Sequence, residues 1–380
     1  MSSAWLLPEH FADVLPAQAR RIEELRRHLL DLALRYGFEL VMPPLVEHLE
    51  SLLSGSGRDQ DLRTFKLVDQ LSGRSLGVRA DTTPQVARID AHLLNRRGVT
   101  RLCYCGPVVH ARPSGPLSSR EPLQFGVEVY GHAGLEADLE VLELALDALE
   151  GLGLDRPLVE LADARCVQTL LGDATAAQRE AVIDALGVRS VQALRQAASG
   201  LANAEELVAL LSFEGGREVL EQAGARLPRL REALADLDWL HEHLQRSHPS
   251  LRIGFDLAAV AGNAYYTGVC FSAYVPGQTL PLLRGGRYDE VGAVFGRRRP
   301  AVGCSLDLKT LVEVLPVKPL RAAVRAPWGE DAGLREQVRR LRQQGETVVC
   351  VLPGHDDEGE EYACDRELVR GSEGWMVRTL

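Results

Sequence analysis

The residue types best suited to chemistry lie within the segment Arg101–Gly131. Two alternating stretches flank a loop rich in Pro, Gly and Ser, and this pattern predicts two strands joined by a long connection. On the return strand Gln124, Gly126 and Glu128 share a face, because side chains two apart point to the same side. Gly126 leaves a flat place where a small molecule could lie between an amide and a carboxylate. Taken alone, the alternation favours a solvated sheet face.

A second polar group precedes a predicted helix. Asp81, Thr82 and Thr83 stand directly before Pro84, which fits the first turn of a helix. Any one of the three polar residues can cap that helix through its side-chain oxygen. Capping needs only one of them, so the group exceeds what the helix demands.

Composition and charge exclude several classes of function. Apolar residues make up 46% and charged residues 25%, as in ordinary globular proteins. No apolar run approaches the roughly 18 residues of a membrane span, and the N-terminus carries no signal pattern, so we expect a cytoplasmic protein without membrane contact. The net charge is −10 and the only dense basic run is Arg297–Arg299, so no nucleic-acid partner is expected. Seven cysteines without a Cys-x-x-Cys pair and the lack of nucleotide fingerprints predict neither a metal site nor a cofactor.

Hydrophobic periodicity predicts the elements that position these side chains. We expect helices at 17–36 and 135–150, a strand at 38–42, and a hairpin at 63–80 that turns at Ser72-Gly73. From 320 the pattern is strand, helix, strand, acidic loop and a hairpin turning between Gly371 and Gly374. These elements predict three parts: a core of 1–159 and 249–315, a helical insertion at 160–248, and a small C-terminal α/β domain at 320–380.

Taken together, these segments resemble the catalytic core of a class II aminoacyl-tRNA synthetase, specifically histidyl-tRNA synthetase. The helix and strand ending at Pro44 resemble the first class II motif, Arg101–Gly131 the second, and residues 300–311 the third. Arg79–Thr83 and Gly262–Thr267 resemble two histidine-specific segments. The resemblance implies an α+β fold, with an antiparallel sheet flanked by helices, and a homodimer formed through the first-motif region.

Three positions that carry an arginine in the synthetases have lost it here. His110 stands where the second motif carries the arginine that holds the ATP α-phosphate, and Thr310 stands at the arginine that clamps the γ-phosphate. Ala261 replaces the histidine-specific catalytic arginine. Neutral imidazole cannot make the charged, two-pronged contact of a guanidinium. Because adenylation depends on positioning and neutralising a triphosphate, we expect no amino-acid activation and no catalytic residues.

The amino-acid end of the synthetase pocket is retained by resemblance. The positions that hold histidine in the synthetases correspond here to Asp81, Thr83, Gln124, Glu128, Tyr265 and Tyr266. Two carboxylates and a hydroxyl suit an α-ammonium group, and the remaining groups suit a ligand with ring nitrogens. Without this context, the two adjacent tyrosines would be one buried and one exposed packing residue.

A synthetase-like body with an altered ATP end resembles the regulatory subunits of ATP phosphoribosyltransferase. That family has segments close to CYCGPVVHARPSG, GGRYDEVGAVFGRRRPAVGCSLDL and APWGEDAGL of this chain. The resemblance implies a non-catalytic protein that forms a hetero-octamer with a short catalytic subunit, activates it, and confers feedback inhibition by histidine. The segment 320–380 is too short for the anticodon-binding domain of the synthetases.

Two alternatives remain open from the residues alone. One is a divergent histidyl-tRNA synthetase or another class II ATP-dependent ligase, with Arg112 or Arg120 as a relocated cation. The other is a scaffold without a ligand, which Ala261 keeps open because the lost arginine lies near the amino-acid pocket.

Overall fold

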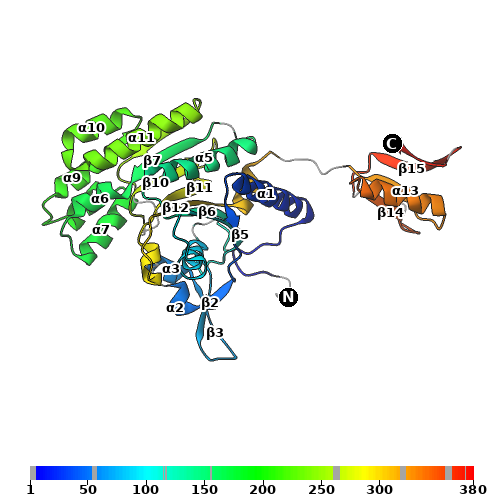
Figure 1. The fold of residues 1–380 in the computed structure, drawn as a ribbon, viewed down its shortest axis with the longest axis horizontal. Coiled ribbons are helices and arrows are strands. Elements are labelled where there is room, and N and C mark those ends of the chain that lie inside the picture. The colour runs from blue at the N-terminus through cyan, green and yellow to red at the C-terminus, as the bar shows by residue number, and fades with distance from the viewer. Residues whose placement is uncertain are drawn as a thin grey trace. The chain divides into compact units, whose positions relative to one another are not determined.

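The structure is a computed structural model in which the chain forms two compact units, Met1–Leu315 and Pro316–Leu380. It describes residues 6–53, 58–113, 115, 118–154, 156–259, 266–316, 322–355, 362–372 and 374–380. Figure 1 shows the helices and strands of both units.

A large sheet organises the first unit. Nine strands of the described residues form it in the order β1-β5-β6-β12-β11-β10-β7-β9-β8. In that order their bounds are Glu39–Leu40, Thr100–Pro107, Leu123–Tyr130, Ala301–Asp307, Leu283–Arg287, Val269–Tyr274, Leu158–Asp163, Arg252–Asp256 and Glu214–Gly215. Neighbouring strands are antiparallel except for the β1–β5 and β7–β9 pairs, which are parallel. The predicted antiparallel sheet is therefore a mixed sheet with mainly antiparallel pairing.

One face of this sheet is covered by helices α1 (Pro16–Arg35), α5 (Leu135–Gly151) and α12 (Leu308–Val314) (Figure 1). The predicted helix at 17–36 is confirmed as α1, whose buried Leu25 and Leu29 lie four residues apart and therefore on one side. They join a core that includes Phe125, Val127 and Val129 of β6. Burying each such side chain contributes about 1.5–3 kcal/mol. Because β6 alternates, its intervening residues are directed to the opposite face of the sheet.

Shorter elements lie beside that opposite face. A three-stranded sheet has the order β2-β4-β3, with bounds Val46–His48, Ser75–Val78 and Phe65–Val68. The helical elements here are α2 (Leu49–Leu52), α3 (Arg58–Arg63), α4 (Thr83–Arg88), η1 (Ile89–Leu94) and η3 (Val291–Phe295). The β3–β4 pairing confirms the predicted hairpin. Its turn is closed by Asp69, which accepts a hydrogen bond from the Ser72 backbone N–H, while Gly73 takes a positive φ of 70°.

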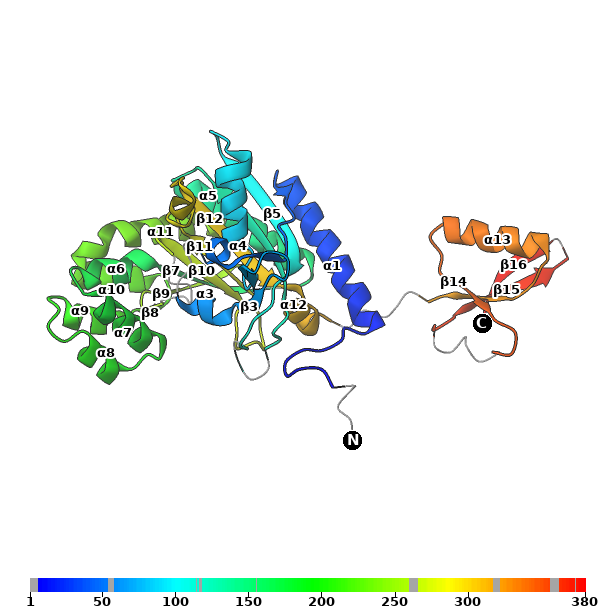
Figure 2. The same cartoon turned by 90° about the horizontal axis from the view of Figure 1, so that it is seen from below.

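Helices predominate between 164 and 247, at the end of the sheet formed by β9 and β8 (Figure 2). They are α6 (Ala164–Leu171), α7 (Ala176–Gly187), α8 (Val191–Ala197), α9 (Ala204–Leu210), α10 (Glu218–Arg226), η2 (Pro228–Leu230) and α11 (Arg231–Ser247). The expectation of helix throughout 160–248 is wrong at β7 and β8. Val159 and Leu161 alternate into the core as strand residues, and Asp163 then caps α6 by accepting from the Arg165 N–H.

The second unit follows the predicted order of elements. Its strands β13 (Val324–Pro327), β14 (Val348–Val351), β15 (Arg366–Gly371) and β16 (Gly374–Thr379) form a sheet in the order β14-β13-β15-β16, with α13 (Ala332–Gln343) packed on it. The β15–β16 pairing places Gly371 opposite Gly374, which confirms the predicted hairpin. Most of the acidic loop falls at 356–361, outside the described residues.

A buried ion pair joins the basic run Arg297–Arg299 to η1 within the first unit. The run looks like a solvated loop in the sequence, yet Arg299 is only 8% exposed. Its guanidinium donates to both carboxylate oxygens of Asp90, at 2.8 and 2.9 Å, and to the Tyr130 carbonyl at 3.4 Å. Arg298 instead is exposed and pairs with Glu290 at the surface. Two adjacent arginines therefore have different roles.

The two arginines make a matched test of this arrangement. We expect Arg299→Ala to lower the free energy of unfolding by about 3–5 kcal/mol, because it leaves the Asp90 carboxylate buried without its partner. Arg298→Ala should change it by no more than about 0.5 kcal/mol. Urea unfolding of both variants measures the difference, and equal effects would contradict the assignment.

Candidate functional site

A cavity of about 260 Å³ lies on the sheet face opposite α1 and α5. The residues that form its wall include five of the six predicted site residues: Asp81, Thr83, Gln124, Glu128 and Tyr266. The sixth, Tyr265, lies outside the described residues. So does Ala261, which stands where the synthetases carry the histidine-specific arginine. The wall also includes Arg63, His110, Arg284, Tyr288, Ser305 and Thr310.

The Glu128 carboxylate is the most deeply placed charged group of the cavity, with the residue 1% exposed. Its Oε1 accepts hydrogen bonds from Thr83 Oγ1 at 2.9 Å and Tyr104 OH at 3.2 Å, and its Oε2 accepts from Tyr288 OH. Burial raises the pKa of Glu128 to about 8, against the opposing effect of these hydrogen bonds. Near neutral pH this group therefore exchanges between acid and carboxylate, and it can donate to or accept from a ring nitrogen.

Asp81, the second carboxylate of the predicted site, is oriented by a hydrogen bond from Gln124. Gln124 Nε2 donates to Asp81 Oδ1 at 2.8 Å and to Ser305 Oγ at 3.3 Å, and its Oε1 accepts from the Thr82 N–H at 3.0 Å. These partners fix both ends of the amide. The predicted ligand residue Gln124 therefore has a positioning role toward Asp81 in this structure.

The expectation of an open flat place at Gly126 is wrong. Gly126 lies opposite Tyr104 of β5, and a Cβ atom added at Gly126 would overlap the Tyr104 phenol. The same holds on the other side, where a Cβ atom at Gly303 of β12 would overlap the Glu128 carboxylate. The glycines therefore admit protein groups that hold Glu128. The sequence could not indicate this, because the cross-strand partner of Gly126 depends on the register.

At the predicted phosphate end, His110 is buried and takes part in two contacts. Its Nε2 donates to the Ala80 carbonyl at 3.0 Å, and Arg63 Nη2 lies 3.3 Å from both ring nitrogens, of which Nδ1 is left to accept. Burial and, secondly, the Arg63 charge lower the pKa of His110, so the ring is neutral. Thr310 donates its hydroxyl to Asp307, the cap of α12, at 2.8 Å.

The two proposed relocated cations, Arg112 and Arg120, do not line the cavity. Arg112 is exposed. Arg120 donates to the His110 carbonyl at 2.9 Å and lies over the rings of Phe11 and Phe65, at 4.9 and 5.0 Å. The cation that does lie at this end is Arg63, which sequence reasoning missed because no motif surrounds it.

Tyr288 and Arg284 were also missed. Both flank the Gly285-Gly286 pair, which looks like an ordinary bend in the sequence. In the structure this pair is part of β11, and a Cβ atom at Gly285 would lie 2.5 Å from the Gly303 carbonyl oxygen. The glycines thus permit close approach of β11 and β12, which brings Tyr288 to Glu128. A strand alternation that includes paired glycines is the signal that could have indicated it.

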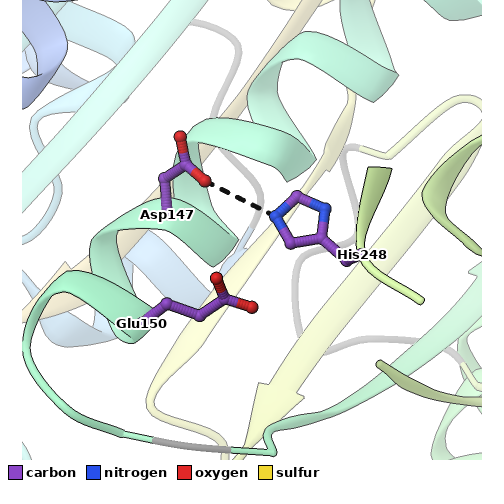
Figure 3. Close-up of side chains that lie close together, drawn as sticks. All are labelled: Asp147, Glu150 and His248. Atoms are coloured by element: carbon purple, nitrogen blue, oxygen red, sulfur yellow. Dashed lines mark ion pairs between the residues drawn. The ribbon is translucent and has the colours of Figure 1, made fainter. Parts of the chain in front are cut away.

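A separate group of side chains lies on the helix-covered side of the sheet (Figure 3). Asp147 and Glu150 of α5 and His248, at the end of α11, place ligand-type atoms within 4.8 Å of one another. Asp147 Oδ1 lies 3.5 Å from His248 Nε2, and Asp147 Oδ2 accepts from Tyr36 OH at 2.6 Å. These contacts join the ends of α1, α5 and α11, which is a structural role.

Comparison with known proteins decides the family. Residues 10–311 match the sequence profile of histidyl-tRNA synthetase, and residues 321–378 match that of the ATP phosphoribosyltransferase subunit HisZ C-terminal domain. The ATP phosphoribosyltransferase regulatory subunit of Variovorax paradoxus (strain S110) is 59% identical over 387 residues, covering 100% of both chains. That of Albidiferax ferrireducens is 58% identical over 385 residues, again covering 100% of both. The chain belongs to the family of ATP phosphoribosyltransferase regulatory subunits.

Solved structures agree with this membership. An ATP phosphoribosyltransferase regulatory subunit/histidyl-tRNA synthetase from Bacillus halodurans C is 29% identical, with a TM-score of 0.82, covering 94% of this chain and 96% of that one. Histidyl-tRNA synthetase from Nostoc sp. PCC 7120 is 18% identical, with a TM-score of 0.78 over 99% and 97%, and is similar in fold alone. The predicted family and the synthetase-like fold are confirmed. None of the helices in the described part of the chain has the length and apolar character of a membrane span.

The buried Glu128 predicts a pH dependence of stability. Its pKa in the folded protein, about 8, lies above the ordinary value of 4.5, so the folded state binds the proton more tightly than the unfolded chain. The resulting stabilisation is fully present below the ordinary value and is lost as the pH rises through about 8. We therefore expect Glu128→Gln, which cannot ionise, to lose less stability between pH 5 and pH 8 than the parent.

Urea unfolding at the two pH values measures this difference. Glu313→Gln is the control, because Glu313 is exposed on α12 and should follow the parent protein. A Glu128→Gln variant with the same pH dependence as the parent would show that burial of Glu128 does not govern the slope.

Proposed function

We propose that this chain is the non-catalytic regulatory subunit of ATP phosphoribosyltransferase, required by a short catalytic subunit and responsible for feedback inhibition by histidine. The observation that carries the proposal is the chemical difference between the two ends of one cavity. The acidic end retains Asp81 and Glu128 with their hydrogen-bond partners, whereas the phosphate end has a neutral His110 and a capping Thr310.

The acidic end suits histidine. Asp81 offers a carboxylate to an α-ammonium group, and the deeper Glu128, with a pKa raised to about 8, suits an imidazole nitrogen in either protonation state. Tyr266 adds an aromatic wall. The volume of about 260 Å³ lies below the roughly 300–1,000 Å³ of pockets for drug-sized ligands, so it suits a single amino acid.

The loss of two cations at the phosphate end supports the absence of catalysis. Removing one donor that stabilises developing charge costs about 2.7–4 kcal/mol in known enzymes. Here two of the synthetase cations are replaced by His110 and Thr310, neither of which supplies a fixed positive charge. Arg63 keeps one cation in this region, and it is the observation that favours a class II ligase as the second candidate.

Assembly and regulation complete the proposal. Leu34 of α1, Leu40 of β1 and Met42 are 69%, 48% and 77% exposed, and this apolar surface supports a homodimer through the first-motif region. The hetero-octamer with the catalytic subunit follows the family resemblance. All seven cysteines are free thiols, which supports a reducing, cytoplasmic location.

A reconstituted rate assay tests the regulatory function. Mixed with a short catalytic ATP phosphoribosyltransferase subunit, the chain should co-elute with it and raise its rate, and histidine should lower that rate by about 5- to 150-fold. Asp81→Asn should raise the histidine concentration needed for inhibition about tenfold, because it removes the charge opposite the ammonium group. Glu313→Gln is the control, and failure to associate would remove the proposal.

Histidine-dependent exchange of pyrophosphate into ATP tests the alternative. We expect no exchange above background, because the triphosphate lacks two of its clamping cations. Robust exchange that Arg63→Ala abolishes would instead establish a ligase with a relocated cation.

A further inference from the structure

Arg284 of β11 is a cation at the cavity wall whose charge is unmatched. The guanidinium makes neither a hydrogen bond nor an ion pair with any residue that the structure describes, and the side chain is exposed. Arg63, the other arginine of the wall, contacts the His110 ring. Arg284 is therefore the cavity arginine most available to an anionic ligand group.

The sheet register places Arg284 next to the acidic end. Arg284 pairs with Ser305 of β12, and Ser305 pairs with Gly126 of β6. Directly opposite residues on neighbouring strands point to the same face, with Cα atoms about 4.5–5.5 Å apart. Ser305 Oγ in turn lies 3.3 Å from Gln124 Nε2, which donates to Asp81. A row of neighbouring side chains thus begins at the carboxylate of Asp81 and ends at the guanidinium of Arg284.

An α-amino acid has the complementary pattern. Its ammonium and carboxylate are bonded to the same carbon atom, so a site that binds both needs an acidic and a basic group close together. Asp81 supplies the acidic group, and the long, flexible side chain of Arg284 begins two strands away from β6 on the same face. A guanidinium also binds a carboxylate through two parallel hydrogen bonds.

We propose that Arg284 binds the α-carboxylate of the amino acid in this cavity and so selects a complete amino acid over its decarboxylated or reduced analogues. The inference rests on the proposed function, in which that amino acid is histidine. The His110 ring at the phosphate end is neutral and offers no cation to the ligand carboxylate. Arg284 supplies that cation from β11. Its role is in specificity, because binding of the ring and ammonium depends on other residues.

Calorimetric titration of the full chain with histidine and with histidinol tests this role, since histidinol carries a hydroxymethyl group in place of the carboxylate. Arg284→Ala should weaken histidine binding about tenfold and leave histidinol binding unchanged. Arg284→Lys, which keeps the charge but not the two-pronged geometry, should lie between the parent and Arg284→Ala. Arg252→Ala is the matched control, because Arg252 is an exposed arginine on β9 of the same sheet, outside the cavity wall.

The outcomes separate this inference from the function on which it rests. Equal effects of Arg284→Ala on both ligands, or no effect on either, would overturn the carboxylate contact while leaving histidine binding intact. If the parent chain binds no histidine, alone or with the catalytic subunit, the proposed function fails and the contact fails with it.

Discussion

The buried carboxylate of Glu128 is the constraint on which the arrangement of the cavity depends. A charged or partly charged group at this depth requires hydrogen-bond donors, because water does not solvate it. The donors come from separate parts of the chain: Thr83 begins α4, Tyr104 belongs to β5, and Tyr288 follows β11. Glycines make room for this arrangement: a side chain at Gly126 would overlap the Tyr104 phenol, and one at Gly303 would overlap the Glu128 carboxylate. One carboxylate therefore sets residue types on the three strands β5, β6 and β12, at the start of α4 and just after β11.

The proposed function gives this cavity of a synthetase-like body a ligand site without a reaction. Binding an amino acid requires complementary groups at one end, which Asp81 and Glu128 provide. Activating it requires fixed positive charge where the triphosphate develops charge, and a neutral His110 does not provide this. Feedback inhibition then needs only that histidine binds one arrangement of the assembly more tightly than another.

Local sequence patterns predicted much of the fold, and the resemblance to the synthetases named six candidate ligand residues, five of which lie at the cavity wall. Helix α1 follows from three-and-four spacing, and the shared face of Gln124 and Glu128 follows from strand alternation. What could not be predicted depends on pairing between distant segments. The Tyr104 partner of Gly126, the Asp90 partner of Arg299 and the placement of Arg63 at the cavity all require register or tertiary contacts that spacing does not encode. The predicted helical insertion at 160–248 wrongly includes residues 160–163 of β7, although Val159 and Leu161 alternate, because the helices that follow dominate the pattern.

In the proposed function this cavity holds histidine with its ring at Glu128 and its ammonium group at Asp81. A crystal structure of the chain grown with saturating histidine would locate the ligand. We expect one histidine in the cavity, with a ring nitrogen within hydrogen-bond distance of the Glu128 carboxylate and the α-nitrogen beside Asp81. An empty cavity, or histidine bound only elsewhere on the chain, would contradict it.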